Sequence, residues 1–208
     1  MPDEGCYWLH FDWSAVEARL ASAYANDLED LEAYKNGLDL HTVTCCHMFN
    51  HRLPVDRSHP HNDAAWGASW TPPWTGKHDR RRHLAKTARY ALTYGMDERA
   101  MLSARDVEKL GLTREELLQA GRAFLASKPA LVAWKNKVWA DCADKGESRT
   151  FLGRRRRLFG DRMDRAKQGL NHMIQGAVAD LANLSIAAIA AQWPESWLIV
   201  NKHDGVIW

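Results

Sequence analysis

The stretch Arg80–Gly95, RRRHLAKTARYALTYG, is the most informative part of this 208-residue sequence. It predicts a helix over 80–94. Within it Arg82, Lys86, Tyr90 and Tyr94 recur at every fourth position and therefore line one face of the helix. The two cations lie toward the N-terminus, which is also the positive end of the helix dipole.

Such a face suits a nucleoside triphosphate bound end to end, with the cations on the phosphates and the rings against sugar and base. The alternative is a surface helix with a half-buried aromatic stripe, and the spacing alone does not exclude it.

Outward from this helix, the sequence predicts a helix-rich α+β fold. A helix start is expected where Ser14 and Glu17 form a capping-box pattern. Further helices are predicted at 28–36, from about 41, at 113–127, at 129–145 and at 164–192. Strands are predicted at 7–11, 197–200 and 206–208, with a basic hairpin at 149–159 that turns at Gly153. The segment 52–79 contains four prolines and reads as a long loop, in which Trp66, Trp70 and Trp74 serve as anchors.

Two aspartates each lie at the end of a strand-like run. Asp12 follows an aromatic strand, and Asp204 lies in a tight turn between two apolar runs. Carboxylates in such places are held rigidly yet open to solvent, which two-metal phosphoryl transfer requires. Turns are rich in aspartate, however, and spacing alone does not show that the two meet.

Two sets of side chains suit nucleic acid. Asn171 and Gln175 lie four residues apart, so their amides share a helix face and suit minor-groove base edges, although an ordinary polar face explains this pair alone. Gly176 beside them permits the close approach of a duplex. Basic clusters near Arg82 and at 154–157 suit a phosphate-binding track, although a solvated face explains either run alone.

The composition sets limits on the remaining classes. The net charge is only +2, no signal peptide is recognisable, and the longest apolar stretch is too short for a bilayer, so we expect a cytoplasmic protein with no membrane partner. The cysteines are too few for a disulfide framework, which fits a reduced compartment. A zinc module lacks the usual C-x2-C pair and remains a minor alternative; its ligands would be His41, Cys45, Cys46 and His47.

Six segments, in order, resemble the motifs of family A DNA polymerases. The segment DWSAVEARL from Asp12 resembles motif A, D-Y-S-Q-I-E-L-R, and NGLDLHT from Asn36 resembles its sequel, N-G-x-D-I-H-T. The opening helix matches motif B, R-x3-K-x3-[FY]-x3-Y-G. TFLGRR from Thr150 is similar to T-x-x-G-R-R, NHMIQGAVAD from Asn171 to N-x-P-x-Q-G-T-A-A-D, and His203-Asp204 to motif C, V-H-D-E.

The resemblance implies an enzyme that adds dNTPs to a primer on template DNA with two Mg²⁺ ions. Asp12 and Asp204 would bind the metals. Arg82 and Lys86, assisted by His41, would bind the triphosphate of the nucleotide. Tyr90 would lie near the sugar and base, and Tyr94 at the templating base. Glu17 would lie against the sugar 2′ position. The DNA contacts implied are Arg154, Arg155, Lys167, Asn171, Gln175 and His203.

The implied architecture is part of a right hand, with a palm of antiparallel sheet and helices and with helical fingers. We expect palm at 1–24 and 164–208 and fingers at 25–163, which include the 80–95 helix. The thumb and an exonuclease domain are expected to be absent and supplied, if at all, by a second polypeptide. A bacterial or phage-infected cell is the expected setting, and the long loop before motif B favours a phage-like lineage.

Two departures and two alternatives stand beside this interpretation. Gly205 replaces the usual motif C glutamate, from which we expect weaker activity or altered metal preference, and Lys167 stands where arginine is common. The alternatives are a single-subunit RNA polymerase and a non-catalytic DNA-binding remnant of a polymerase; Glu17 and Tyr90 favour deoxynucleotides over the former.

Overall fold

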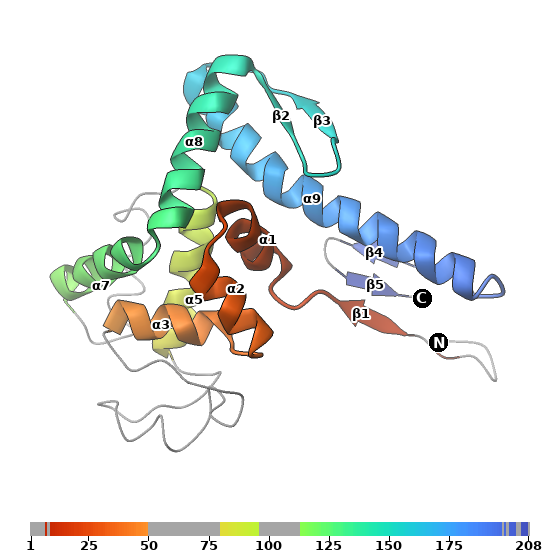
Figure 1. Cartoon of the computed structure of the whole chain (residues 1–208), viewed down its shortest axis with the longest axis horizontal. Helices are drawn as coiled ribbons and strands as arrows, with labels where there is room; N and C mark the ends of the chain where they lie inside the picture. The colour runs from red at the N-terminus through yellow and green to blue at the C-terminus, as the bar shows by residue number, and fades with distance from the viewer. Residues whose placement is uncertain are drawn as a thin grey trace. The chain divides into compact units, whose positions relative to one another are not determined.

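The computed structural model describes residues 7, 9–49, 80–95, 113–196, 198, 200–202 and 205–207. The predicted 52–79 loop and two candidate site residues, His203 and Asp204, lie outside these residues. The chain divides into two compact units, Met1–Leu20 with Ala140–Trp208 and Ala21–Trp139 (Figure 1). The functional boundaries expected for palm and fingers stay predictions.

The unit Ala21–Trp139 is built around one buried helix. Helix α3 (Leu40–Phe49) packs against α5 (Arg80–Thr93) and α7 (Arg114–Ser127) and also contacts α2 (Leu28–Lys35) (Figure 1). Its apolar contacts come from fully buried side chains, chiefly Leu40, Val43, Leu84, Leu92, Leu117 and Phe124. Burying each of these leucines stabilises the fold by about 1.5–3 kcal/mol. This core holds α5, and with it the face singled out in the sequence.

The helix starts of this unit follow the local sequence signals. Asp27 caps α2 by accepting a hydrogen bond from the backbone N–H of Asp30, and Thr113 forms a reciprocal capping box with Glu116 at the start of α7. Helix α8 (Pro129–Lys145) begins at the predicted proline. The predicted helices at 28–36, 80–94, 113–127 and 129–145 are therefore confirmed within two residues.

One predicted cap is wrong. Helix α1 (Val16–Ala25) begins after Ala15, whose φ of 50° places it in the left-handed region, so Ser14 does not occupy the capping position. A turn at Ser14 and Ala15 separates the preceding strand from the helix, and this turn overrides the capping-box pattern.

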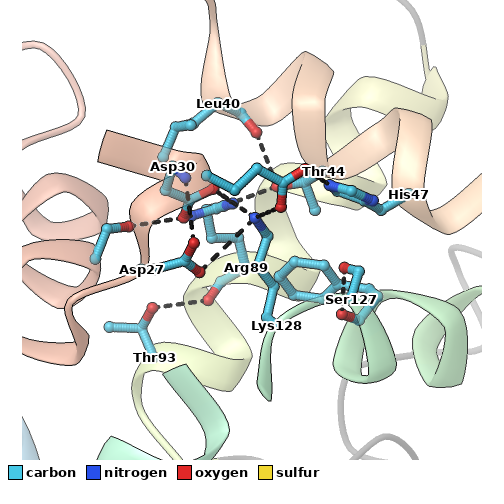
Figure 2. Close-up of polar contacts among 12 residues, drawn as sticks. Asp27, Asp30, Leu40, Thr44, His47, Arg89, Thr93, Ser127 and Lys128 are labelled. Atoms are coloured by element: carbon cyan, nitrogen blue, oxygen red, sulfur yellow. Dashed lines mark hydrogen bonds and ion pairs between the residues drawn. The ribbon is translucent and has the colours of Figure 1, made fainter. Parts of the chain in front are cut away.

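A buried charged cluster joins the helices of the same unit (Figure 2). Asp30 of α2 accepts hydrogen bonds from both terminal nitrogens of Arg89 on α5, at 2.5 and 3.1 Å, and from Lys128 Nζ at 2.7 Å. Arg89 Nε also donates to Thr44 Oγ1 of α3 at 2.7 Å. The side chains of Asp30 and Lys128 are fully buried. Burial raises the pKa of Asp30, but Arg89 and Lys128 outweigh burial and hold this pKa far below its usual value. We call these three residues the buried cluster.

The other unit contains a three-stranded antiparallel sheet. Strands β1 (His10–Asp12), β5 (Gly205–Ile207) and β4 (Val200–Lys202) lie in the order β1-β5-β4. The first strand begins at His10, not residue 7, and it includes Asp12, because β1 pairs with β5 over only three residues. Strand β5 confirms the strand predicted at 206–208 within one residue, whereas β4 begins at Val200, the last residue of the strand predicted at 197–200.

A hairpin packs on a long helix in this unit. Strands β2 (Glu147–Arg149) and β3 (Arg155–Arg157) form the predicted basic hairpin, with Gly153 at a φ of 85° in its turn. Strand β2 lies along α9 (Arg162–Gln192) (Figure 1). A Cβ added to Gly176 would lie 2.9 Å from Thr150 Cγ2, so this glycine admits the hairpin itself. The structure thus gives a reason for Gly176 other than the duplex expected from the sequence.

Helix α9 is, in the described part of the chain, the one helix long and apolar enough to cross a membrane by length and composition. It also makes buried polar contacts with the hairpin: His172 Nδ1 lies 2.7 Å from Ser148 Oγ, and Asp180 accepts from Thr150 Oγ1 at 2.6 Å. The buried side chains of α9 lie between Ala166 and Ala182, so this part of the helix forms the core of its unit, as such contacts are typical of protein interiors.

Candidate active site

Arg82, Lys86 and Tyr90 share one side of α5, and Tyr94 directly follows the last residue of that helix, Thr93. Lys86 is exposed, whereas Arg82, Tyr90 and Tyr94 are half-buried. Lys86 Nζ lies 5.9 Å from the centroid of the Tyr90 ring, within the range of a cation–π contact. The helix therefore presents cationic and aromatic groups side by side, as the four-residue spacing predicts.

His41 extends this face from the first turn of α3. Its ring centroid lies 5.9 Å from that of Tyr90, and the side chain is almost wholly buried. Burial, helped by the nearby cations Arg82, Arg89 and Lys86, lowers the pKa of His41 to about 4 against the opposing effect of Asp39. The ring is therefore neutral near pH 7. Its Nδ1 has no hydrogen-bond partner among the described residues, and a buried polar atom in this position favours a ligand.

Asp39 holds the guanidinium of Arg82. Its Oδ2 accepts from Arg82 Nε and its Oδ1 from Arg82 Nη2, both at 2.8 Å. The same Oδ2 accepts from the backbone N–H of Thr42 at 2.9 Å and from its hydroxyl at 2.7 Å. Burial raises the pKa of Asp39, but the bonds from Arg82 and Thr42 outweigh burial and bring the pKa to about 2. Asp39 was not among the predicted site residues, although an aspartate three residues before Thr42 is a recognisable helix-cap signal.

Asp12 is an exposed residue at the end of β1. In the antiparallel register it lies opposite Gly205, the residue that directly follows Asp204 in the sequence. Glu17, on the first turn of α1, is half-buried. Asp204 and His203 lie outside the described residues, so the shared metal site stays a prediction.

The candidate DNA contacts fall into two sets. Lys167, Asn171 and Gln175 are exposed at successive four-residue steps of α9 and have no hydrogen-bond partner among the described residues. By contrast, Arg154 is paired with Asp180 at 2.5 Å, and Arg155 with Glu147 at 2.9 Å. The two arginines thus have internal partners that the sequence analysis did not foresee.

The alternative zinc site has unfavourable ligands. Burial raises the pKa of the Cys46 thiol to about 12, which disfavours the thiolate that zinc requires. His47 Nε2 lies 2.9 Å from Glu29 Oε1, so a carboxylate already occupies that nitrogen. Within the described ranges, no three His, Cys, Asp or Glu side chains gather as a metal-binding group.

Comparisons with known proteins agree on one family. The model of DNA polymerase family A matches residues 1–208. The chain is 23% identical over 218 residues to DNA polymerase I of Lactococcus lactis subsp. lactis and 25% identical over 213 residues to DNA polymerase I of Geobacillus stearothermophilus. These alignments cover 100% and 96% of this chain but 22% and 21% of the relatives, so the chain spans about a fifth of their length.

The fold is similar to that of a solved polymerase domain. The POL domain of Pol1 from M. smegmatis, solved in complex with DNA primer-template and dNTP, matches with a TM-score of 0.74 at 20% identity. The match covers 99% of this chain and 34% of that one. The predicted fold class, a helix-rich α+β chain that forms part of a polymerase hand, is confirmed.

Proposed function

This chain belongs to DNA polymerase family A, and from this membership we propose that it adds dNTPs to the 3′ end of a primer on template DNA and releases pyrophosphate. The observation that carries the proposal is the register of β1 and β5, in which Asp12 lies opposite the residue next to Asp204. The similarity to DNA polymerases I, and to a polymerase domain solved with DNA primer-template and dNTP, supports the same chemistry, with primer-template DNA and dNTPs as partners.

Asp12 and Asp204 are the residues that would hold two Mg²⁺ ions. The donor set fits, because carboxylate oxygens are the ligands that Mg²⁺ prefers and the Asp12 carboxylate is open to solvent. When bound, such ions supply Lewis-acid activation of an attacking hydroxyl and neutralise charge on the phosphates.

The side chains on α5 and α3 would bind the nucleotide. Arg82 and Lys86 supply cations for the triphosphate, and the neutral ring of His41 donates a hydrogen bond from a nitrogen that has no described partner. Tyr90 packs against sugar and base, and Tyr94 lies at the templating base. In the other unit Glu17 excludes the sugar 2′-hydroxyl.

The DNA would be held by the hairpin and α9. Lys167, Asn171 and Gln175 carry the contacts near the new base pair, with His203 from the motif C turn. Arg154 and Arg155 contact the backbone while they keep their internal carboxylate partners. The chain acts in the cytoplasm of a bacterial or phage-infected cell.

Primer extension tests this function. The 208-residue chain is incubated with a labelled primer-template, Mg²⁺ and either dNTPs or NTPs. We expect extension with dNTPs that Asp12→Asn reduces by roughly two orders of magnitude or more, because an amide binds Mg²⁺ more weakly than a carboxylate. Asp144→Asn is the matched control, since it changes an exposed carboxylate of the same unit, whose ion pair in the described part of the chain is with Arg162.

Three outcomes contradict the proposal. Extension that Asp12→Asn leaves unchanged removes the metal assignment, and a preference for NTPs favours a single-subunit RNA polymerase. Salt-sensitive DNA binding that survives Asp12→Asn, with no extension by the unsubstituted chain, favours a non-catalytic remnant.

A further inference from the structure

Arg82 is the half-buried cation of the candidate nucleotide site, and its orientation is set by a residue outside the motif face. We infer that Asp39 is the positioning residue for Arg82: it holds the guanidinium in the orientation that the nucleotide site uses. This inference rests on the proposed function, because it deepens the nucleotide site assigned there.

The geometry of the Arg82–Asp39 pair supports this role. Two parallel bonds of 2.8 Å join the Nε and Nη2 atoms of Arg82 to the two carboxylate oxygens of Asp39. A two-point contact fixes both the plane and the direction of a guanidinium, which a single bond does not. The orientation of the Arg82 guanidinium is therefore set by Asp39 in two dimensions.

Asp39 is itself held in place by Thr42. It directly precedes α3, and its Oδ2 accepts from both the backbone N–H and the hydroxyl of Thr42. These bonds tie the carboxylate to the same helix turn that carries His41. Asp39 therefore sets the position of Arg82 relative to His41, although Arg82 lies on α5, 43 residues further along the chain.

The effect of removing Asp39 on triphosphate binding differs in sign between a charge effect and a positioning role. An aspartate beside a phosphate-binding arginine lowers the positive potential that a triphosphate meets, so removing it would tighten binding if charge alone mattered. A positioning role predicts weaker binding, because a released arginine regains rotamer freedom that the ligand must then restrict. Charge and positioning thus predict opposite signs.

The experiment compares three substitutions at this position. Equilibrium binding of dATP with Mg²⁺ is measured by calorimetry on the 208-residue chain with a primer-template that ends in a 3′-dideoxynucleotide, and unfolding is followed in urea. Asp39→Ala removes both the helix cap and the arginine partner. Asp39→Ser restores the cap, since serine is a favourable capping residue, but it cannot form the two-point ion pair. Asp39→Glu retains a carboxylate that can reach Arg82.

We expect Asp39→Ala and Asp39→Ser both to weaken dATP binding about tenfold, an effect of the size of one charge-assisted hydrogen bond. Asp39→Ser should recover most of the stability lost in Asp39→Ala, and Asp39→Glu should recover part of the affinity. Recovery of affinity in Asp39→Ser would show that Asp39 acts only as a helix cap, and tighter binding in either neutral variant would show that it acts only as a charge; both results overturn the inference.

Arg82→Ala separates this inference from the proposed function. Loss of dATP binding in Arg82→Ala together with unchanged binding in Asp39→Ser would refute the positioning role alone. Failure of the unsubstituted chain to bind dATP, or binding that Arg82→Ala leaves intact, would remove the nucleotide site and the inference with it.

Discussion

Arg82 and Arg89 lie on the same helix and each makes two bonds to one aspartate, yet their surroundings differ. The side chain of Arg89 is 1% exposed, its partner Asp30 is fully buried, and Lys128 adds a second cation. The side chain of Arg82 is 16% exposed, its partner Asp39 is 23% exposed, and it lies beside Lys86 and Tyr90 on the candidate nucleotide face. Arg89 joins α2 and α3 to α5, and Lys128, the residue before α8, bonds to the same aspartate, whereas Arg82 lies on the candidate nucleotide face.

This contrast separates a structural ion pair from a functional one by burial. A fully buried pair stabilises the fold only as long as both partners remain, because an isolated buried charge is costly. A half-buried pair contributes less to stability and leaves room for binding. The predictions below test that difference.

The largest expected effect is on stability at the buried cluster. Arg89→Met should lower the free energy of unfolding by about 3–5 kcal/mol, because it leaves Asp30 buried with only Lys128 as a cationic partner. Arg82→Met should lower it by about 1 kcal/mol, since Asp39 can be solvated. Urea unfolding of both variants measures the difference, and equal losses would contradict the contrast.

The next effect is on acid stability. Both carboxylates have a pKa below the unfolded value of about 4, so each stabilises the fold above that pH and loses its contribution as pH falls through its folded pKa. For Asp39 the loss spans roughly pH 4 to pH 2 and amounts to about 2 kcal/mol. For Asp30 it occurs at lower pH. Unfolding of Asp39→Asn and of Asp30→Asn as a function of pH measures both.

For Asp39→Asn, the difference in free energy of unfolding between the unsubstituted chain and the variant should shrink between pH 4 and pH 2. For Asp30→Asn, the same difference should persist at pH 3. The opposite order would show that Arg82, not Arg89, makes the stronger ion pair.

The smallest effect on stability is expected at Lys86, which is exposed on the nucleotide face. Lys86→Gln should change the free energy of unfolding by less than about 0.5 kcal/mol, because a substitution at the surface removes little packing. The same change should weaken dATP binding several-fold through the lost charge. Lys137→Gln, an exposed lysine on α8 of the same unit, is the matched control and should alter neither quantity. Equal dATP affinity in the two variants would remove Lys86 from the site.

Much of the fold is predictable because its signals are local. The capping box of Thr113, the proline at the start of α8 and the glycine turn of the hairpin each depend on residues within a few positions, and all three were found. The cap at Ser14 fails because Ala15 adopts a positive φ and the helix begins after it. The start of β1 also differs from the prediction, because its pairing with β5, a strand far away in the sequence, sets where β1 begins.

The sequence by itself determined the family, the helices and the shared face of Arg82, Lys86 and Tyr90, because a helix repeats every 3.6 residues and that face is written into the spacing. Only the tertiary structure decided which carboxylate each arginine meets. Asp39 and Arg82 are 43 residues apart, and Asp30 and Arg89 are 59 apart. The residue types alone do not select these pairs, because any exposed arginine attracts any carboxylate about equally. The packing of α3 against α5 determines which aspartate each arginine meets and how deeply the pair is buried.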